Sequence, residues 1–514
     1  MAHFSASSKF DCSVETLFGY HEAAGAIDRL IPPWEPATVA SGIDSLAVGS
    51  IVEVDNWLGP FRQRWVAEHI ALEPNRLFID QLNSSPFAKW VHAHRFVALE
   101  EGQLDFPNGP ELTARAELTA RAELTDSVEY CLPMDPLSRI AIPWVHRKLA
   151  GMFRFRHRIT RDDLEFAQRL FGVSSEAIYS SELKERPKRI GISGASGLIG
   201  RRTVALARVL GIEVVRLERT SPKPNSRESV VRWPRGVRSV SMSRWVSQPK
   251  SAEWLSGLDA WIHLGGVGIA DRRWSDQTKR SIRESRVRST EQIVGLLHGL
   301  EVPPKCFVCA SGVGAFGNRG EEVLSEDSSI EEAATGDDFL ADVAREWEHS
   351  ALSYVSPTNR TGQSSQESLR VAIARFGMVL HPRAGALSKL LLPFRLGLGG
   401  PIGNGKQYWP WIHIDDAASV LLHLALRPGC QGIYHATAPE TLTNRDFSKT
   451  LGRVLSRPTI LPAPAFAMRL LLGEMADSLL LSSVRVTTDR LLQSGYQFRF
   501  PRLAPALANL LGTA

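Results

Sequence analysis

The feature that most constrains this chain is a strand, a glycine-rich turn, a helix and a second strand in direct succession. The run RIGISGASGLIGRRTVALARVLGIEVVRLER begins at Arg189, and apolar residues dominate both strand segments. Gly194, Gly197 and Gly200 mark the turn between the first strand and the helix. This order predicts the start of a dinucleotide-binding α/β fold, in which a turn of small residues brings a helix N-terminus to a phosphate.

The position of this unit, far from the start of the chain, implies more than one domain. The chain has 514 residues, and at about 100–200 residues per domain its length suggests two to four domains. Downstream, strand-like runs alternate with helical patterns, which is typical of a Rossmann-type doubly wound parallel sheet. Upstream, several strand-like runs precede one long helical stretch, which indicates an α+β domain. We expect domains at 1–175, 188–430 and 431–514, with a linker at 176–187.

The composition fits a folded globular protein and argues against two classes of partner. There are 60 Lys and Arg against 55 Asp and Glu, a net charge of +5 without a dense basic run, so a dedicated nucleic-acid binder is not expected. Charge or glycine interrupts every apolar stretch before the roughly 20 residues that a membrane span needs. The first residues lack the apolar core of a signal peptide. We therefore expect a cytoplasmic protein with a small-molecule substrate and no membrane span.

The last two thirds of the chain resemble a known family. The blocks that carry the resemblance are GISGASGLIGR, DRRWSDQTKRSIRESRV, GEEVLSEDS, RFGMVLHPRAGALSKLLLPFRLGLGGPIGNGKQYWPWIHIDD and the tail from ATAPETLTNRDF to GEMAD. They resemble the atypical extended short-chain dehydrogenases called epimerase family proteins, including their C-terminal domain of unknown function, DUF1731. The resemblance implies a Rossmann-type sheet, a bound NAD(P) and oxidoreductase or epimerase-like chemistry.

A second resemblance covers the N-terminal part, from about residue 4 to residue 170. HEAAGAIDRLIPPW, SPFAKWVHAHRF and FRFRHRITRDDL carry it. These segments are similar to the START-like, polyketide-cyclase-like helix-grip domains. That similarity implies a curved antiparallel sheet around a long helix, with a hydrophobic small molecule as the ligand.

The glycine-rich turn supplies the predicted cofactor site. The first glycine permits a tight turn, the second lets the backbone approach a pyrophosphate, and the third lets the helix pack on the strand. At the end of the second strand, a carboxylate favours NAD and an arginine favours NADP. Both residue types stand there, Glu218 and Arg219, and the resemblance places Arg219 where relatives carry their arginine. We predict NADP, with NAD as the alternative. The predicted cofactor contacts are Gly194, Ala195, Ser196, Gly197, Leu198, Ile199, Gly200, Arg219, Leu264, Gly265 and Gly266.

The residues that usually transfer the proton in short-chain dehydrogenases are missing. That class uses a Tyr followed four residues later by Lys, and none of the 7 tyrosines here has such a partner. In DFLADVAREWE, the helix expected to carry the pair, the aligned positions are Leu340 and Ala344. Other side chains must then supply any chemistry. We predict catalytic roles for Ser311, Tyr408 and His413, and substrate contacts from Arg272, Trp274 and Trp411.

No metal site is predicted. Cys306 and Cys309 form a CxxC, but it lies in an apolar run typical of a buried strand and lacks a second ligand pair. His92 and His94 alternate along a strand and share one face. The next carboxylate on that face, Glu100, is roughly 20 Å along the strand from His94. We interpret the two histidines as hydrogen-bonded structural residues.

Two functions from different classes remain open at this point. The first is an NADP-dependent oxidoreductase that acts on an unidentified small molecule. The second is a non-catalytic NADP(H)-binding sensor or scaffold with a small-molecule-binding N-terminal domain, which the missing Tyr–Lys pair favours. The block GLGGPIGNGKQYWPWIH, rich in glycine and aromatic residues, favours the enzyme.

Overall fold

The computed structural model describes residues 1–42, 45–99, 121–134, 137–174, 177–179, 188–218, 237–242, 255–330, 338–355 and 369–513. These residues form two compact units, which divide in the main between Lys188 and Arg189. Each unit is built on its own seven-stranded sheet. Among the described residues, no helix has both the length and the apolar character that crossing a membrane requires.

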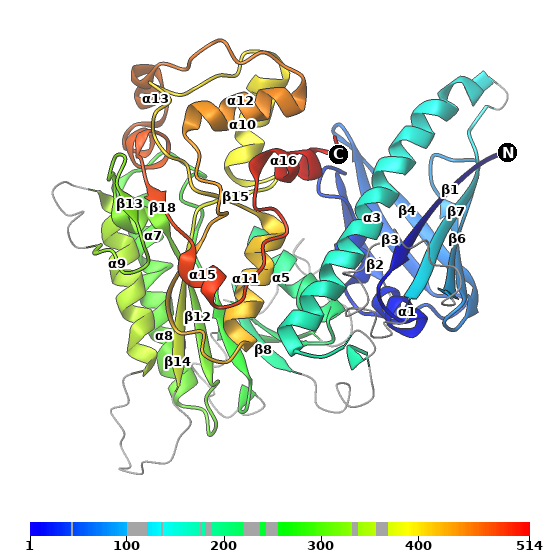
Figure 1. Ribbon diagram of the computed structural model, residues 1–514, viewed down its shortest axis with the longest axis horizontal. Coiled ribbons are helices and arrows are strands. Elements are labelled where there is room, and N and C mark those ends of the chain that lie inside the picture. Colours follow the sequence, from blue (N-terminus) through cyan, green and yellow to red (C-terminus); the bar gives the residue numbers. More distant parts are fainter. Residues whose placement is uncertain are drawn as a thin grey trace, which may run out of the picture. The chain divides into compact units, whose positions relative to one another are not determined.

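The first unit is an antiparallel sheet with one long helix against it (Figure 1). The strand order is β1-β7-β6-β5-β4-β3-β2, so most neighbours in the sheet are also neighbours in the chain. Residues alternate between buried and partly exposed along β7, as expected for a sheet with one face packed on the core. The strands are β1 (Ala2–Phe10), β2 (Ala37–Gly42), β3 (Ile51–Leu58), β4 (Phe61–Glu73), β5 (Leu77–Ser84), β6 (Lys89–Leu99) and β7 (Arg121–Cys131).

Helix α3 (Ile142–Phe171) covers one face of this sheet. Val145, Leu149 and Phe153 recur at helical spacing and pack with Trp90 and Val128 of the sheet in one buried cluster. The helix ends at Gly172, whose left-handed backbone (φ 66°) is the conformation that glycine adopts without strain. The short helices α1 (Val14–Glu22) and α2 (Ala26–Leu30) connect β1 to β2.

The second unit is the doubly wound sheet that the sequence predicts. Its strand order is β10-β9-β8-β11-β12-β14-β17, and the chain reverses direction across the sheet between β8 and β11. The pairs β8–β11, β11–β12, β12–β14 and β14–β17 are parallel. The strands are β8 (Arg189–Ser193), β9 (Glu213–Glu218), β10 (Val237–Ser241), β11 (Ala260–His263), β12 (Cys306–Gly312), β14 (Arg370–Phe376) and β17 (Gly432–Ala436).

Helices cover both faces of this sheet (Figure 1). On one side lie α8 (Val287–His298) and α9 (Phe339–Leu352), and on the other α5 (Leu198–Val209) and α11 (Ile414–Leu426). Cys306 and Cys309 are buried within β12, where burial raises the pKa of the Cys306 thiol to about 12. The prediction that the CxxC belongs to a buried strand is therefore confirmed.

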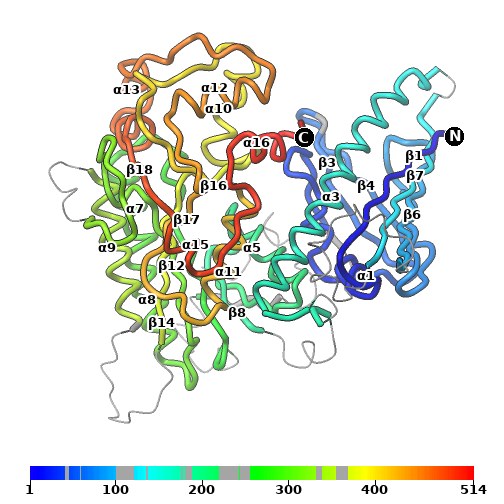
Figure 2. The backbone as a smooth tube through the Cα atoms, viewed as in Figure 1, coloured from blue at the N-terminus to red at the C-terminus, as the bar shows by residue number. Residues whose placement is uncertain are grey.

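The C-terminal part adds elements around the ends of these strands. The chain from β17 onward forms α12 (Asn444–Leu455), α13 (Ala465–Leu472), β18 (Arg485–Val486), α15 (Asp489–Gln493) and α16 (Leu503–Leu511). It also returns past α11 (Figure 2). There, Ser494 contacts His423 and Tyr496 contacts Ser419. Residues such as Phe447, Phe500 and Leu507 complete a core with the strand β16 (Trp411–His413).

Candidate functional site

The three glycines of the turn after β8 differ in what surrounds them. Gly194 has a left-handed backbone (φ 78°), and a Cβ there would lie 2.5 Å from the carbonyl oxygen of Leu264. A Cβ on Gly200 would lie 2.3 Å from the oxygen of Gly194. A Cβ on Gly197, by contrast, would meet only that same oxygen, at 3.3 Å. The first and third glycines are therefore required by the packing of the turn, whereas the second leaves its outer side open to an incoming group.

The turn after β11 faces the glycine-rich turn across the switch point of the sheet. Leu264 N–H donates to the Ser193 oxygen at 2.9 Å, which joins the carboxyl ends of β8 and β11. Below it, the Ser193 hydroxyl lies 2.6 Å from His263 Nδ1. Burial lowers the pKa of His263 to about 3, so its imidazole is neutral at pH 7. Crevices of this kind, beyond the carboxyl ends of strands at a switch point, are where doubly wound folds bind ligands.

Several charged groups surround the first turn of α5. Arg201 Nε donates to the Ser196 carbonyl at 2.8 Å, so its cation stays beside the turn. Arg202 instead forms a salt bridge of 2.6 Å with Asp415 Oδ1. Glu218, the last residue of β9, pairs with Arg216, whose pKa burial lowers to about 10. Arg219 lies outside the described residues, so its predicted cofactor contact stays a prediction.

Helix α9 carries the two positions at which the Tyr–Lys pair is missing, Leu340 and Ala344. Glu348 follows one further turn along, so the three share a face. Glu348 is buried, and its Oε1 accepts a hydrogen bond of 2.6 Å from the Ser311 hydroxyl of β12. The Arg375 guanidinium of β14 donates to both Glu348 oxygens at 2.8 Å. The Ser311 proton is thus directed to an internal carboxylate, which the sequence analysis did not anticipate.

The other two residues with predicted catalytic roles lie in separate surroundings. Tyr408 is half-buried, with the Arg485 guanidinium 4.9 Å from its ring centroid. His413 is 0% exposed and stacks on Phe500, with 4.0 Å between the ring centroids. The structure engages Ser311, Tyr408 and His413 in three different sets of contacts. Their predicted catalytic roles stay predictions, and the ring of His413 is packed in the core.

Trp411 also belongs to the core. It is 0% exposed, and its Nε1 donates to the Glu440 carbonyl at 3.2 Å. Its predicted contact with substrate stays a prediction, and in the structure the indole packs in the core of the domain. Arg272 is exposed, and Trp274 is half-buried, with its indole N–H donating to the Ile269 carbonyl at 2.8 Å. These two residues remain predicted substrate contacts.

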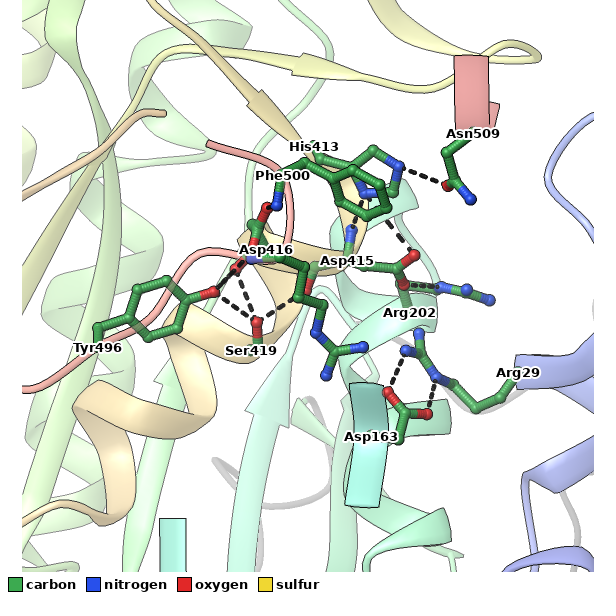
Figure 3. A network of polar contacts seen from close by, with 11 residues as sticks. Arg29, Asp163, Arg202, His413, Asp415, Asp416, Ser419, Tyr496, Phe500 and Asn509 are labelled. Atoms are coloured by element: carbon green, nitrogen blue, oxygen red, sulfur yellow. Dashed lines mark hydrogen bonds and ion pairs between the residues drawn. The ribbon is translucent and has the colours of Figure 1, made fainter. Parts of the chain in front are cut away.

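The start of α11 is held by a polar network (Figure 3). His413, not Asp415, is the N-cap, because its Nδ1 accepts from the Asp415 N–H at 3.0 Å. His413 Nε2 lies 3.0 Å from Asn509 Oδ1. Asp416 accepts from the Tyr496 hydroxyl at 3.0 Å, and burial raises its pKa to about 6. Both aspartates lie in the first turn of the helix, where negative charge is favourable.

One further cation near the crevice was missed by the sequence analysis. Arg286 is half-buried behind the turn after β11, and a Cβ on Gly266 would lie 3.1 Å from its Cζ. Its Nη1 donates to the Val267 carbonyl at 3.1 Å, and burial lowers its pKa to about 10, which leaves it charged at pH 7. In the sequence it is one of many charges in RRWSDQTKRSIRESRVRS, and only the fold distinguishes it from its solvated neighbours.

Comparison with known families agrees with this architecture. The NAD dependent epimerase/dehydratase family matches residues 190–435, and the domain of unknown function DUF1731 matches residues 463–510. An epimerase family protein from Arabidopsis thaliana, the chloroplastic SDR39U1 homolog, is 32% identical over 342 residues, which are 66% of this chain and 91% of that protein. The chain belongs to the epimerase family. The human epimerase family protein SDR39U1 is 31% identical over 326 residues, 63% of this chain and 99% of the human protein.

Two solved structures extend the comparison. A nucleoside-diphosphate sugar epimerase from Corynebacterium glutamicum is 27% identical, with a TM-score of 0.70, and the match covers 99% of this chain and 90% of that one. Human SDR39U1, in a crystal structure with NADPH, is 29% identical, with a TM-score of 0.54. This match covers 63% of the present chain and 100% of the human chain. The match to the C. glutamicum structure extends over both units. The human match has the length of one unit.

Proposed function

We propose that this chain is an NADP-dependent, epimerase-like oxidoreductase that acts on a small molecule. The observation that carries the proposal is the turn at the switch point, where Gly194 and Gly200 are closed by packing and the outer side of Gly197 is open. In this proposal the turn and the start of α5, residues 194–200, hold the pyrophosphate, because the first N–H groups of a helix have no intrahelical partner. Leu264, Gly265 and Gly266 border the adenosine side.

The choice of NADP over NAD rests on the end of β9. Glu218 is the carboxylate that would accept from an adenosine ribose, and it already pairs with Arg216. Arg219 follows it directly and is the group proposed to contact a 2′-phosphate. The crystal structure of human SDR39U1 with NADPH supports the same assignment. Arg202 takes no part in this proposal, since Asp415 holds its guanidinium.

A bound nicotinamide would supply the hydride step, and the chain would position the substrate and move any proton. The Ser311 hydroxyl would accept a hydrogen bond from the substrate and would not donate one, because its own proton is directed to Glu348. Tyr408 is the best placed of the predicted proton carriers, since its side chain is partly exposed. Arg272 and Trp274 would contact the substrate. The name of the C. glutamicum relative makes a nucleoside-diphosphate sugar the first substrate class to try.

A second function, NADP(H) binding without turnover, is favoured by one observation. The two positions of the usual proton-transfer pair, Leu340 and Ala344, hold apolar side chains, and the nearest carboxylate on that face is engaged by Ser311 and Arg375. Oxidation of bound NADPH by a carbonyl substrate would select the enzyme. A protein that binds NADPH but turns over none of a broad carbonyl panel would select the sensor.

We further infer that residues 1–175 form a START-like helix-grip domain for a hydrophobic ligand. The seven-stranded antiparallel sheet and the long helix packed on it support this inference. Among the aromatic residues of this domain, Phe78, Phe96 and Phe153 are buried, whereas Trp57 is exposed. A linker at 176–187, a division near 430 and a cytoplasmic location stay predictions.

Replacing Gly197 by aspartate is expected to weaken NADPH binding by at least about 100-fold, or roughly 2.7 kcal/mol. The new carboxylate would occupy the open side of the turn and repel a pyrophosphate, while Gly194 and Gly200 keep the turn intact. Titration of the purified full chain with NADPH and with NADH, followed by nicotinamide fluorescence, measures this effect. Arg219→Ala should weaken NADPH binding and leave NADH binding unchanged.

Gly295→Asp is the matched control for the new charge. Gly295 is exposed on α8, and a Cβ there meets no atom within 4 Å. It should bind NADPH as the parent does. Equal affinity of the Gly197→Asp variant and the parent would remove the proposed pyrophosphate site, and failure of the parent to bind either nucleotide would remove the proposed function.

A further inference from the structure

A cluster of histidines and aspartates lies on the helix-covered face of the N-terminal sheet. Strand register brings it together: Asp80 of β5 is opposite His92 of β6, and Asp126 of β7 is opposite His94 of β6. His69 of β4 is opposite Asp80 on the other side. Directly opposed residues of neighbouring strands share a face. The sequence analysis looked for a carboxylate along the strand of the histidines and therefore missed two that stand on adjacent strands.

Three atoms of this cluster converge with the spacing of metal ligands. Asp80 Oδ2 lies 3.9 Å from His92 Nδ1 and 3.4 Å from His94 Nε2. All three ligand atoms lie within 4.8 Å of one another. With metal–ligand bonds of about 2.0–2.1 Å, ligand atoms at tetrahedral positions are roughly 3.3–3.4 Å apart. A small adjustment of side chains therefore accommodates one cation between them.

The opposite nitrogens of both histidines point to a single carboxylate. Asp126 Oδ1 lies 2.9 Å from His92 Nε2 and 2.7 Å from His94 Nδ1. Its second oxygen lies 2.6 Å from His157 Nε2 of α3, and His157 Nδ1 lies 2.8 Å from the Ser8 hydroxyl. Metal-bound histidines almost always direct their second nitrogen to a carboxylate or a carbonyl, which fixes the tautomer. One buried aspartate performs that task here for two imidazoles.

The contacts with Asp126 determine which nitrogen of each imidazole is available to a metal ion. An ionised carboxylate only accepts hydrogen bonds, so the nitrogens that face Asp126 carry protons. His92 Nδ1 and His94 Nε2 are the other nitrogens, and both face Asp80 Oδ2. A metal ion bound there would replace any proton on these two nitrogens and would take three ligand atoms that already converge.

A third histidine faces Asp80 from the other neighbouring strand. His69 Nδ1 lies 2.5 Å from Asp80 Oδ1, whereas Asp80 Oδ2 faces His92 and His94. Carboxylates that bind metal ions are commonly held by a second polar group in this way. The cluster therefore orients Asp80 as well as the two imidazoles.

We propose that the N-terminal domain binds a divalent transition metal ion, of the zinc class, through Asp80, His92 and His94. Two imidazole nitrogens and one carboxylate oxygen suit zinc and its neighbours in the first row. Phe78 stacks on His94 with 3.9 Å between ring centroids, so one side of the site is apolar. Asp80 is the most exposed of the three, at 20% of its side chain, so a water molecule or small ligand that completes the coordination would reach the ion from the side of Asp80.

The test is zinc binding by the purified full chain, after removal of any affinity tag and treatment with a chelator. Isothermal titration and elemental analysis should give one zinc per chain. Cobalt(II), used in place of zinc, should show the visible absorption bands of an ion with four ligands. Asp126→Asn should weaken zinc binding by about 10–100-fold, the usual effect of losing a residue that orients a ligand. Asp80→Asn and His94→Ala should each weaken it further.

The matched control is His3→Ala, on the same sheet. His3 Nε2 lies 2.9 Å from the Ser127 hydroxyl and takes no part in the cluster, so this variant should bind zinc as the parent does. Near-ultraviolet circular dichroism verifies that each variant is folded, and zinc should raise the unfolding temperature of the parent but not of folded Asp80→Asn. The proposal is overturned if the folded parent binds no zinc or cobalt. It is equally overturned if Asp80→Asn and His94→Ala bind them as well as the parent, because the metal would then lie elsewhere.

Discussion

Replacing Glu348 by alanine is expected to destabilise the second unit by about 3–5 kcal/mol, the usual cost of leaving one partner of a buried ion pair alone. Arg375 is 1% exposed and Glu348 is 4% exposed, and the guanidinium meets both carboxylate oxygens at 2.8 Å. Without Glu348, the Arg375 cation would keep, among its contacts with the described residues, the face of the Phe316 ring, 4.9 Å from its Cζ. The hydroxyl of Ser311 would lose its acceptor at the same time.

Thiol labelling of Cys309 measures this effect within the unit concerned. Cys309 is buried in β12 two residues before Ser311, so a reagent reaches it only when the strand opens. Peptide mass spectrometry separates its labelling from that of the other cysteines. The Glu348→Ala variant should be labelled roughly 100–4,000 times faster than the parent, which is the same free energy expressed as a ratio.

Two companion variants test the cause. Glu346→Ala removes an exposed glutamate from the same helix, whose contact with Arg283 is 3.4 Å long, and should change labelling by less than about fivefold. The double variant Glu348→Met with Arg375→Met removes both charges and should recover much of the loss, because no unpaired charge remains. A double variant as unstable as Glu348→Ala alone would show that packing, and not the charge, is responsible.

The sequence predicted best what is encoded locally. At Gly194 and Gly200 any side chain would clash with nearby backbone atoms, so the turn requires glycine at both positions and the requirement is visible in the sequence. The strand, turn and helix around them follow within one short segment, and the parallel sheet follows from the alternation of strands and helices. The buried CxxC was recognisable for the same reason, since an apolar run surrounds it.

What sequence reasoning missed depends on contacts between distant segments. Ser311 is 37 residues from Glu348, and His92 is 34 residues from Asp126. Only strand register and helix packing bring these side chains together, and no local pattern contains them. The sequence does contain a weak signal for the buried Glu348. Arg375 interrupts the apolar strand RVAIARF, and a buried arginine needs a carboxylate nearby.

The surroundings of the aromatic block near residue 410 also depend on other segments. Trp411 and His413 were predicted to lie at a site because glycine, aromatic and histidine residues often gather around ligands. In the structure both side chains are buried, with Phe500 stacked on His413 and the Glu440 carbonyl accepting from the Trp411 indole. Whether such residues line a site or fill a core is decided by what packs on them, and no pattern within the block itself specifies these partners.

Replacing Asp163 by alanine should have an effect of similar size in the first unit, about 3–5 kcal/mol. Arg29 of α2 and Asp163 of α3 are both 0% exposed and form a bidentate pair, with Nε to Oδ2 at 2.8 Å and Nη2 to Oδ1 at 2.6 Å (Figure 3). The Tyr20 hydroxyl of α1 donates to the same Oδ2 at 2.9 Å. One carboxylate thus ties three helices together, and its loss would remove the bidentate counter-charge of a fully buried cation.

Hydrogen exchange of peptides from α1, α2 and α3 reports on this unit alone, because each peptide is assigned to its place in the chain. Asp163→Ala should reduce their protection by roughly 100–4,000-fold and leave peptides of β12 and β14 unchanged. Glu73→Ala is the control. Its pair with Arg76 is 3.9 Å long and exposed, and surface pairs of this kind contribute at most about 1 kcal/mol. Unchanged protection in Asp163→Ala would mean that the helices are held by the apolar packing of α3 on the sheet, and that the ion pair adds nothing to it.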